Sequence, residues 1–230
     1  SFSDRAMAAG PGSPAIFTRT LLEFESGRFD DGNRFLEQLL KNASESPPWP
    51  LFTYASAAYC IAVTARITGV PDRFELAEES ADRILSASNA IATYRLTAQM
   101  ALAIIAVIKD DAPNCRKLYT ELLVLQGSIQ TAISVDRILG LMSQSMSNLD
   151  QAALHFEDAL TLCRKGGYHP ELAWSCCDYA DMLVERQNDG DQAKAMTLLD
   201  ESLSISTELG MKPLMERVQS RQQKLGAQAS

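Results

Sequence analysis

The stretch from Ser147 to Leu160, SNLDQAALHFEDAL, decides the expected fold. Asn148 stands where a helix N-cap is expected, and Gln151 follows three residues later, which is the spacing of a capping box. Small and aromatic residues then recur at helical spacing, at Ala152, Phe156, Ala159 and Leu160. We expect the small residues to let two helices approach closely, with Phe156 filling the space between them. The stretch therefore predicts the turn and second helix of a helical hairpin.

Two neighbouring features support such hairpins. The close-packing point of the first helix is expected in the run Ile138, Leu139, Gly140 and Leu141. A similar turn and second helix are expected near the N-terminus, with Gly32 at the position that Ala152 holds in the first stretch; the matching residues are Gly27, Phe29, Gly32, Leu36 and Leu39. The pattern therefore predicts several hairpins of one kind.

The composition favours an all-α protein. Aromatic residues make up only 7% of the 230 residues, while alanine and leucine are frequent, which favours helices packed through small residues over a sheet. No convincing alternation of apolar and polar residues occurs between turn signals, so we expect no strand. The first helices of the expected pairs cover about 15–26, 51–68, 90–109, 129–146 and 170–186, and a last helix covers about 213–225.

Turn residues supply the expected helix ends. Asp72 and Glu75 have the spacing of a second capping box, and Asp111 is expected near the start of a further helix. The proline-rich run at 46–50 is expected to stop the first pair, because proline cannot continue a helix. Residues 1–14 end in GPGSP and are expected to be a disordered linker, and residues 227–230 a disordered tail.

The pattern of small, aromatic and small residues resembles the tetratricopeptide repeat. The matching bulky position recurs in the second helices, at Leu36, Ala81, Tyr119, Phe156 and Leu199. These intervals exceed the roughly 34 residues of the regular repeat, so we expect longer helices and looser turns. The resemblance implies a right-handed superhelix of about five antiparallel helix pairs over residues 15–226, with the last helix as a cap.

The segment from about Tyr119 to Leu225 is similar to the tetratricopeptide-like region of large bacterial signalling proteins. Residues 133–186 (ISVDRILGLMSQSMSNLDQAALHFEDALTLCRKGGYHPELAWSCCDYADMLVER) and 190–218 (GDQAKAMTLLDESLSISTELGMKPLMERV) carry this similarity. Such proteins join an ATPase module to the helical array, and many add a nucleotide cyclase or a LuxR-type DNA-binding domain, broadly like the maltose-regulon activator. Nothing resembling those other domains is present in this sequence, so the similarity implies an accessory interaction or sensor array.

Charge and cysteine usage limit the setting. The net charge of −8 makes direct nucleic-acid contact a poor expectation, since that affinity depends on Lys and Arg. The five cysteines form no CxxC motif, which is typical of a reduced cytoplasmic protein. No apolar run is long enough to span a membrane, and no signal peptide is visible. Because the chain begins with Ser1 rather than Met, we expect it to be part of a longer protein.

The sequence predicts no catalytic, cofactor or metal site. His155 and His169 are the only histidines; we expect His155 to face solvent and His169 to lie at a helix start. Their spacing from Cys163, Cys176 and Cys177 fits no zinc motif, so these cysteines are expected to be small core or groove residues. The usual phosphate-loop, dinucleotide, hydrolase and metalloprotease motifs do not occur.

The resemblance places binding in a concave groove lined by the first helices. The groove candidates are Tyr59, Val63 and Arg66 from the second pair, Met100, Ile104 and Val107 from the third, Arg137, Leu141 and Gln144 from the fourth, and Trp174, Asp181 and Glu185 from the fifth. The apolar members are also explained as core residues. An exposed Trp174 beside Arg137 would favour an acidic or aromatic peptide, or a carboxylate-bearing ligand. The alternative is that Trp174 packs between helix pairs and that Arg137 pairs with Asp136 or Glu171 on the rim of the groove.

The expected function is therefore a non-catalytic module without a cofactor. It would bind a peptide or a partner domain, including other domains of the same parent chain, without contacting nucleic acid or membrane. Two alternatives stay open: a small-molecule sensor array, as in the maltose-type regulators, and an enzyme with an unrecognised site in the groove. A ligand-dependent melting shift without turnover would favour the sensor, and turnover lost on groove substitutions would favour the enzyme.

Overall fold

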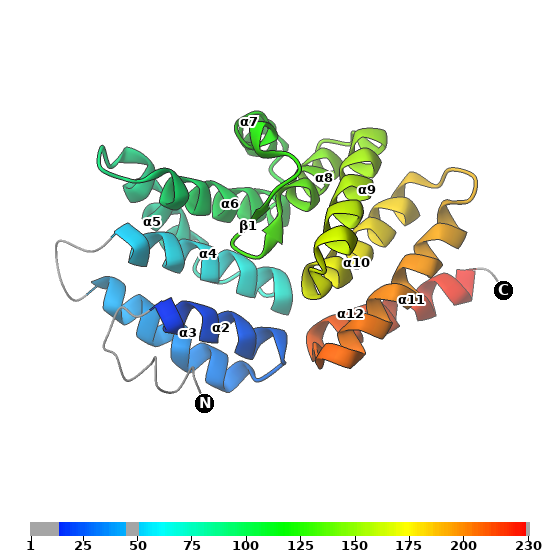
Figure 1. Ribbon diagram of the computed structural model, residues 1–230, viewed down its shortest axis with the longest axis horizontal. Coiled ribbons are helices and arrows are strands. Elements are labelled where there is room, and N and C mark those ends of the chain that lie inside the picture. Colours follow the sequence, from blue (N-terminus) through cyan, green and yellow to red (C-terminus); the bar gives the residue numbers. More distant parts are fainter. Residues whose placement is uncertain (1–13, 45–50, 229–230) are drawn as a thin grey trace. The chain divides into compact units, whose positions relative to one another are not determined.

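The computed structural model describes residues 14–44 and 51–228, and this part of the chain is almost entirely helical (Figure 1). It contains eleven α-helices and almost no strand, which confirms the predicted all-α class. None of these helices is both long and apolar enough to cross a membrane. The chain divides into two compact units, the first ending at Ile108 and the second beginning at Lys109.

The described residues of the first unit form five helices: α2 (Pro14–Glu25), α3 (Phe29–Ser44), α4 (Leu51–Thr68), α5 (Phe74–Ser86) and α6 (Ala92–Ile108). Helix α2 packs on α3, α4 packs on α5, and α6 packs on both α4 and α5. The predicted helix over 51–68 is confirmed by α4, which ends before Gly69. Residues 1–13 and 45–50, which hold most of the expected linker and the proline-rich stop, lie outside the described residues.

The second unit holds the remaining elements: α7 (Ala112–Leu122), the 3-10 helix η1 (Leu123–Leu125), β1 (Ile129–Gln130), β2 (Ile133–Ser134), α8 (Val135–Ser145), α9 (Leu149–Gly166), α10 (His169–Arg186), α11 (Asp191–Leu209) and α12 (Lys212–Gln228). From α7 to α12, each α-helix packs on the next one along the chain. Helix α12 continues through Gln228, so residues 227 and 228 are helical rather than a disordered tail, and residues 229–230 lie outside the described part.

Glycine at two helix faces explains the close packing of the hairpins. A Cβ atom on Gly140 of α8 would lie 3.0 Å from the ring of Phe156 on α9, and the Phe156 ring is fully buried. The same relation occurs in the first unit, where a Cβ on Gly32 would lie 2.7 Å from the ring of Phe24. Because real Cβ atoms rarely come so close, glycine is what lets these rings sit between the helices. The predicted roles of Gly140 and Phe156 are therefore confirmed.

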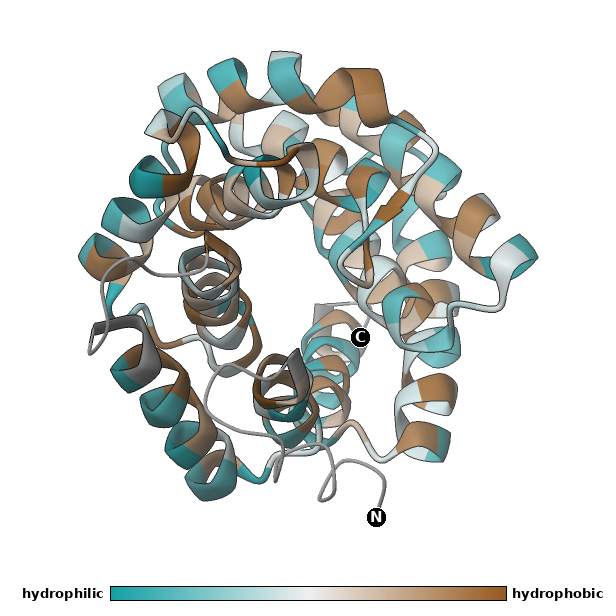
Figure 2. Ribbon diagram, turned by 60° about the vertical axis from the view of Figure 1, so that its left-hand side comes forward, coloured by the Kyte–Doolittle hydropathy of each residue, from teal (hydrophilic) through white to brown (hydrophobic). Residues whose placement is uncertain are grey.

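The helices separate apolar from polar side chains, as packed helices do. In Figure 2 many helices are brown on one side and teal on the other. Helix α4 is the exception, because it is buried around almost its whole circumference and is rich in alanine. Alanine lets neighbouring helices approach from several directions, so α4 forms the centre of the first unit.

A short β-hairpin replaces the start of one predicted helix. The sequence predicts a helix over about 129–146, but α8 begins at Val135, and β1 pairs antiparallel with β2 before it. The two residues between the strands, Thr131 and Ala132, have φ of 49° and 68°. Two consecutive positive φ values are typical of a tight hairpin turn, which usually contains glycine or asparagine. Because neither residue type occurs here, the sequence carries no turn signal.

The two predicted capping boxes are wrong, and a third helix start is right. Asn148 occupies the N-cap of α9, but its side chain makes no capping hydrogen bond. At α5 the N-cap is Arg73 rather than Asp72, and its backbone is left-handed, with φ of 60°. At α7 the predicted helix start is confirmed, and the Asp111 carboxylate caps it by accepting a hydrogen bond from the backbone N–H of Asn114 at 3.2 Å.

Candidate functional site

The predicted groove residues divide into a buried and an accessible set. Six of the ten main candidates are core residues: Tyr59, Met100, Ile104, Arg137, Leu141 and Trp174. Of the two further ones, Val63 is buried and Val107 is partly exposed. The accessible candidates are Glu185, which is exposed, and Arg66, Gln144 and Asp181, which are partly exposed. The accessible candidates of the second unit lie on α8 and α10.

Arg137 is the centre of a buried ionic network between α8 and α10. Its guanidinium donates to both carboxylate oxygens of Glu171, at 2.7 and 3.0 Å, and to Asp178 at 2.9 Å. The backbone N–H of Ser134 also donates to Glu171, at 2.8 Å. The pairing of Arg137 with Glu171 is the predicted alternative, but it lies in the core, with Arg137 only 4% exposed, rather than on a rim.

The electrostatics of this network follow from its burial. Burial alone would lower the pKa of the Arg137 guanidinium, but the facing charges of Glu171 and Asp178 raise it above its ordinary value. Burial also raises the pKa of Glu171, against the opposing effect of Arg137. Because the guanidinium fork already holds two carboxylates out of water, Arg137 joins α8 to α10 and is not presented to a ligand.

Trp174 is covered rather than exposed. Its side chain is 5% exposed, and the guanidinium carbon of Arg217 on α12 lies 4.8 Å from the centroid of the indole ring. The hypothesis of an exposed tryptophan beside an exposed arginine is therefore wrong for both residues. Repeat geometry assigns the position of Trp174 to a groove, but in the structure its side chain packs against a later helix, α12.

Accessible polar side chains connect α8, α10 and α12. The Gln144 amide donates to Glu185 at 2.6 Å, and the Arg221 guanidinium donates to both oxygens of Asp181. With Arg217, which is also partly exposed, these side chains form a surface that we term the α8–α10–α12 face; its members are Gln144, Asp181, Glu185, Arg217 and Arg221. The face is polar and of mixed charge, and it includes three of the four accessible groove candidates.

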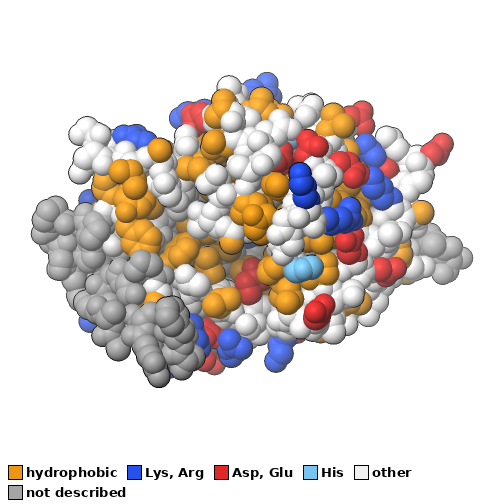
Figure 3. All heavy atoms as spheres, in the orientation of Figure 1, with side chains coloured by type: hydrophobic (Ala, Val, Ile, Leu, Met, Phe, Trp, Pro, Cys, Tyr) orange, Lys and Arg blue, Asp and Glu red, His pale blue; other side chains and the backbone are white. Residues whose placement is uncertain are grey.

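Charges of both signs also alternate elsewhere on the second unit. Arg164 pairs with Glu201 across α9 and α11, and Lys194 pairs with Glu157 between the same helices. The face of the molecule in Figure 3 shows acidic side chains beside basic ones in this part of the chain. Helices α9 and α11 therefore present ion pairs to solvent rather than charges of one sign.

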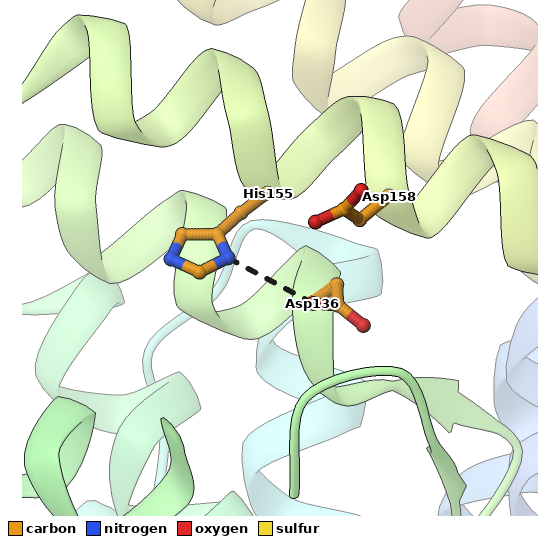
Figure 4. A group of neighbouring side chains, drawn as sticks. All are labelled: Asp136, His155 and Asp158. Atoms are coloured by element: carbon orange, nitrogen blue, oxygen red, sulfur yellow. Dashed lines mark ion pairs between the residues drawn. The ribbon is translucent and has the colours of Figure 1, made fainter. Parts of the chain in front are cut away.

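His155 belongs to a second polar cluster, and the expectation that it faces solvent is wrong. Its side chain is 1% exposed, and its Nε2 lies 2.8 Å from the hydroxyl of Tyr119 and 3.1 Å from the amide nitrogen of Gln151. Its Nδ1 lies 3.7 Å from Asp136 Oδ1 (Figure 4). Among the described residues, one group of possible ligands lies close enough together to hold a metal ion, namely Asp136, His155 and Asp158.

The cysteines have the predicted structural role in the core. All five are free and buried. Burial raises the pKa of the Cys163 and Cys177 thiols to about 12, so both stay protonated near neutral pH. A buried, protonated thiol is a poor nucleophile and a poor metal ligand, so these side chains act as small apolar groups.

Sequence reasoning found Glu171 as a partner of Arg137, but it missed Asp178 and the burial of His155. Asp178 lies seven residues after Glu171 on α10, which places both on the same face of the helix, and this spacing could have identified it. The burial of His155 follows from the wide apolar face of α9, where Ala152, Ala153 and Phe156 are also buried. Comparison with protein-family models, curated proteins and solved structures finds no match to this chain.

Proposed function

We propose that this chain is a non-catalytic interaction module of a cytoplasmic bacterial signalling or transcription-regulatory protein. Its ligand would be a peptide or a partner domain bound on the α8–α10–α12 face. The observation that carries the proposal is the set of accessible polar contacts between these helices, Gln144 with Glu185 and Asp181 with Arg221. The similarity of residues 133–186 to regulatory helical arrays supports the same reading, and the five free cysteines suit a reducing compartment.

The energetics of exposed ion pairs favour exchange with a partner. A solvent-exposed ion pair contributes only about 0–1 kcal/mol, because water screens it and two side chains must be held in place. Asp181 and Arg221 are each about one third exposed, at 36% and 31% of their side chains. A partner carrying charges of both signs can therefore replace these contacts at little cost, which suits a polar, reversible interface.

The burial of Trp174 and Arg137, which the sequence offered as ligand contacts, changes the expected partner. With Trp174 and Arg137 in the core, the preference for an aromatic or carboxylate-bearing ligand loses its basis. The accessible residues instead favour a peptide or domain surface that carries both acidic and basic side chains. Another domain of the same parent chain is the first candidate, because the resemblance places such arrays in large multidomain proteins.

Site-specific photocrosslinking in the full-length parent protein tests the proposal. A photoreactive residue is introduced at Gln144 on the face, and at Gln192, an exposed residue of α11, as the matched control. We expect a defined crosslinked product from position 144 alone, and its loss when Glu185→Lys is added. Equal crosslinking from both positions would contradict the proposal. Ligand-dependent melting with a metabolite and no crosslink would favour the sensor, and turnover abolished by Asp181→Ala would favour the enzyme.

A further inference from the structure

Three potential metal ligands come together beside the turn that follows η1. Asp136 lies near the start of α8, while His155 and Asp158 lie three residues apart on α9 and so share one helix face. One ligand atom from each lies within 4.8 Å of the other two. Figure 4 shows the His155 ring with one nitrogen directed at Asp136 and with Asp158 beside it on the same helix.

The turn between η1 and β1 fixes one oxygen of each carboxylate. The backbone N–H of Gly127 donates to Asp136 Oδ2 at 2.7 Å, and the side-chain amide of Gln126 donates to Asp158 Oδ2 at 3.0 Å. Hydrogen bonds of this kind hold carboxylate ligands in position in protein metal sites. Two consecutive residues of one turn thus orient two carboxylates from two different helices.

Two buried atoms facing each other have no hydrogen-bond partner. They are Oδ1 of Asp136, whose side chain is fully buried, and Nδ1 of His155. The 3.7 Å between them is too long for a hydrogen bond. A buried carboxylate oxygen and a buried ring nitrogen that lack hydrogen-bond partners destabilise the folded state. We therefore expect both atoms to bind one shared partner. Arg137, the next residue, is already held by Glu171 and Asp178.

We infer that Asp136, His155 and Asp158 form a binding site for a divalent transition-metal ion, with Zn²⁺ as the first to test. An imidazole nitrogen with two carboxylates suits such ions better than Ca²⁺ or Mg²⁺, which prefer oxygen ligands alone. Two carboxylates and a neutral imidazole also balance the charge of a divalent ion. Neighbouring ligands of tetrahedral zinc lie about 3.3 Å apart, so the Asp136–His155 spacing is nearly right and the exposed Asp158 can rotate inward.

The surroundings supply the second contact of the histidine and a route for the ion. With its proton on Nε2, the ring donates to the Tyr119 hydroxyl at 2.8 Å and turns the Nδ1 lone pair toward Asp136, as metal-binding histidines do. Asp158 is exposed, so an ion can enter from its side and keep water as a further ligand. The bound ion would tie the turn at Gln126 to α8 and α9, a role independent of the α8–α10–α12 face.

A chain of hydrogen bonds without an ion is the competing arrangement. The Gln151 amide nitrogen faces His155 Nε2 at 3.1 Å, which suits the tautomer that carries its proton on Nδ1. A small movement would then let the ring donate to Asp136 Oδ1. The two arrangements differ in which nitrogen of the His155 ring carries the proton. They also differ in whether Zn²⁺ binds at the other nitrogen, and both differences can be measured.

Zinc titration of the metal-free chain tests the site. After removal of metal with a chelator, we expect one Zn²⁺ per chain by calorimetry, a higher melting temperature with Zn²⁺, and visible absorption bands on substitution with Co²⁺. Asp158→Asn should weaken Zn²⁺ binding at least about tenfold while leaving the melting of the metal-free chain unchanged, since Asp158 is exposed. His155→Gln should lose the site as well.

Two matched variants control for non-specific uptake. Asp200→Asn alters an exposed aspartate of α11 that, like Asp158, accepts a hydrogen bond from a glutamine amide. His169→Gln removes the exposed histidine. Both should bind Zn²⁺ as the unaltered chain does. The inference is overturned if no stoichiometric Zn²⁺ binds, if binding survives Asp158→Asn, or if ¹⁵N NMR finds a proton on His155 Nδ1 that Zn²⁺ does not displace.

Discussion

At the scale of single residues, the second unit contains a buried arginine whose removal leaves two carboxylates without their cation. Arg137 is 4% exposed and lies between Glu171 and Asp178, both of which are also buried. Such a network need not add stability relative to apolar residues of the same size. Removing only its cation, however, leaves negative charges facing each other out of water. The network therefore constrains which substitutions at α8 and α10 can be tolerated.

We expect Arg137→Met to lower the free energy of unfolding by about 3–5 kcal/mol, because it leaves Glu171 and Asp178 uncompensated. Urea denaturation followed by circular dichroism measures this change. The triple variant with Glu171→Gln and Asp178→Asn is the control, and it should recover a large part of the loss because the opposing charges are gone. A loss below about 1 kcal/mol in the single variant, within the range of an exposed ion pair, would contradict the role given to the network.

Gly140 offers a prediction about packing in which two effects oppose each other. Alanine is the better helix former by about 1 kcal/mol, but its Cβ would lie 3.0 Å from the ring of Phe156. Phe156 is fully buried and stacks on Tyr179 at a centroid distance of 5.3 Å, so it has little room to move. We expect Gly140→Ala to cost about 1–3 kcal/mol net.

Gly226 is the control for that substitution, because it is helical and no heavy atom beyond its immediate chain neighbours and its own helix backbone lies within 4 Å of where a Cβ would stand. Gly226→Ala should therefore leave the melting temperature unchanged or raise it, by the helix-propensity gain alone. If both alanine variants raise the melting temperature equally, the close approach of α8 and α9 does not depend on glycine.

At the scale of elements, the sequence predicts helices well and irregular backbone poorly. Helix α4 covers the predicted range, and α10 ends at the predicted Arg186, because proline, glycine and apolar spacing mark those ends. The hairpin before α8 is missed because its turn residues, Thr131 and Ala132, adopt positive φ without glycine. The left-handed cap at Arg73 is missed for the same reason. When packing elsewhere in the fold holds a non-glycine residue at positive φ, the local sequence does not predict that conformation.

The candidate site was harder to predict than the fold. Repeat spacing gives the helix of a groove residue, but it does not tell whether another helix covers that position. Trp174 is covered by Arg217 from α12, which follows two helices later in the chain, and Met100 is buried within the first unit. The predicted accessibility is correct for two polar candidates, Gln144 and Glu185, which also contact each other. Accessibility at such positions depends on long-range packing.

The contact between α9 and α11 leads to a prediction about pH. The hydrogen bonds from Arg164 lower the pKa of Glu201 below its ordinary value. A carboxyl whose pKa is lower in the folded state contributes stability above its unfolded pKa of about 4.3, and that contribution is lost as the pH falls through the folded value. Glu201→Gln should therefore cost up to about 1 kcal/mol at pH 7, with the difference vanishing toward pH 3.

Unfolding in urea at several pH values between 7 and 3 measures this difference directly. Glu208→Gln, an exposed glutamate on the same helix, is the control and should change stability little at any of these pH values. If Glu201→Gln is equally destabilising at both ends of the range, the ion pair with Arg164 is not the source of its effect.

At the scale of the whole molecule, the all-α class follows from composition, whereas the division into two units does not. The sequence predicts one continuous domain over 15–226, with helices 90–109 and 113 onward as a pair. The structure divides between these helices, placing α6 with α4 and α5, and α7 with α8. The turn there, at Asp110 and Asp111, looks in sequence like the turns inside the other pairs. Two units are separate where few contacts cross between them. The residues of a turn do not predict the number of those contacts.

The second unit gives the last prediction, that residues 109–230 fold by themselves. From α7 onward each α-helix packs on its neighbour in sequence, so the contacts that stabilise the unit are mainly local and contained within it. We expect this fragment to show a helical circular dichroism spectrum and one cooperative thermal transition. A shorter fragment from Val135 lacks Tyr119, which contacts His155, and the Ser134 N–H, which donates to Glu171. It should melt at a lower temperature, and equal melting of the two fragments would show that α7 and the hairpin add no stability to the unit.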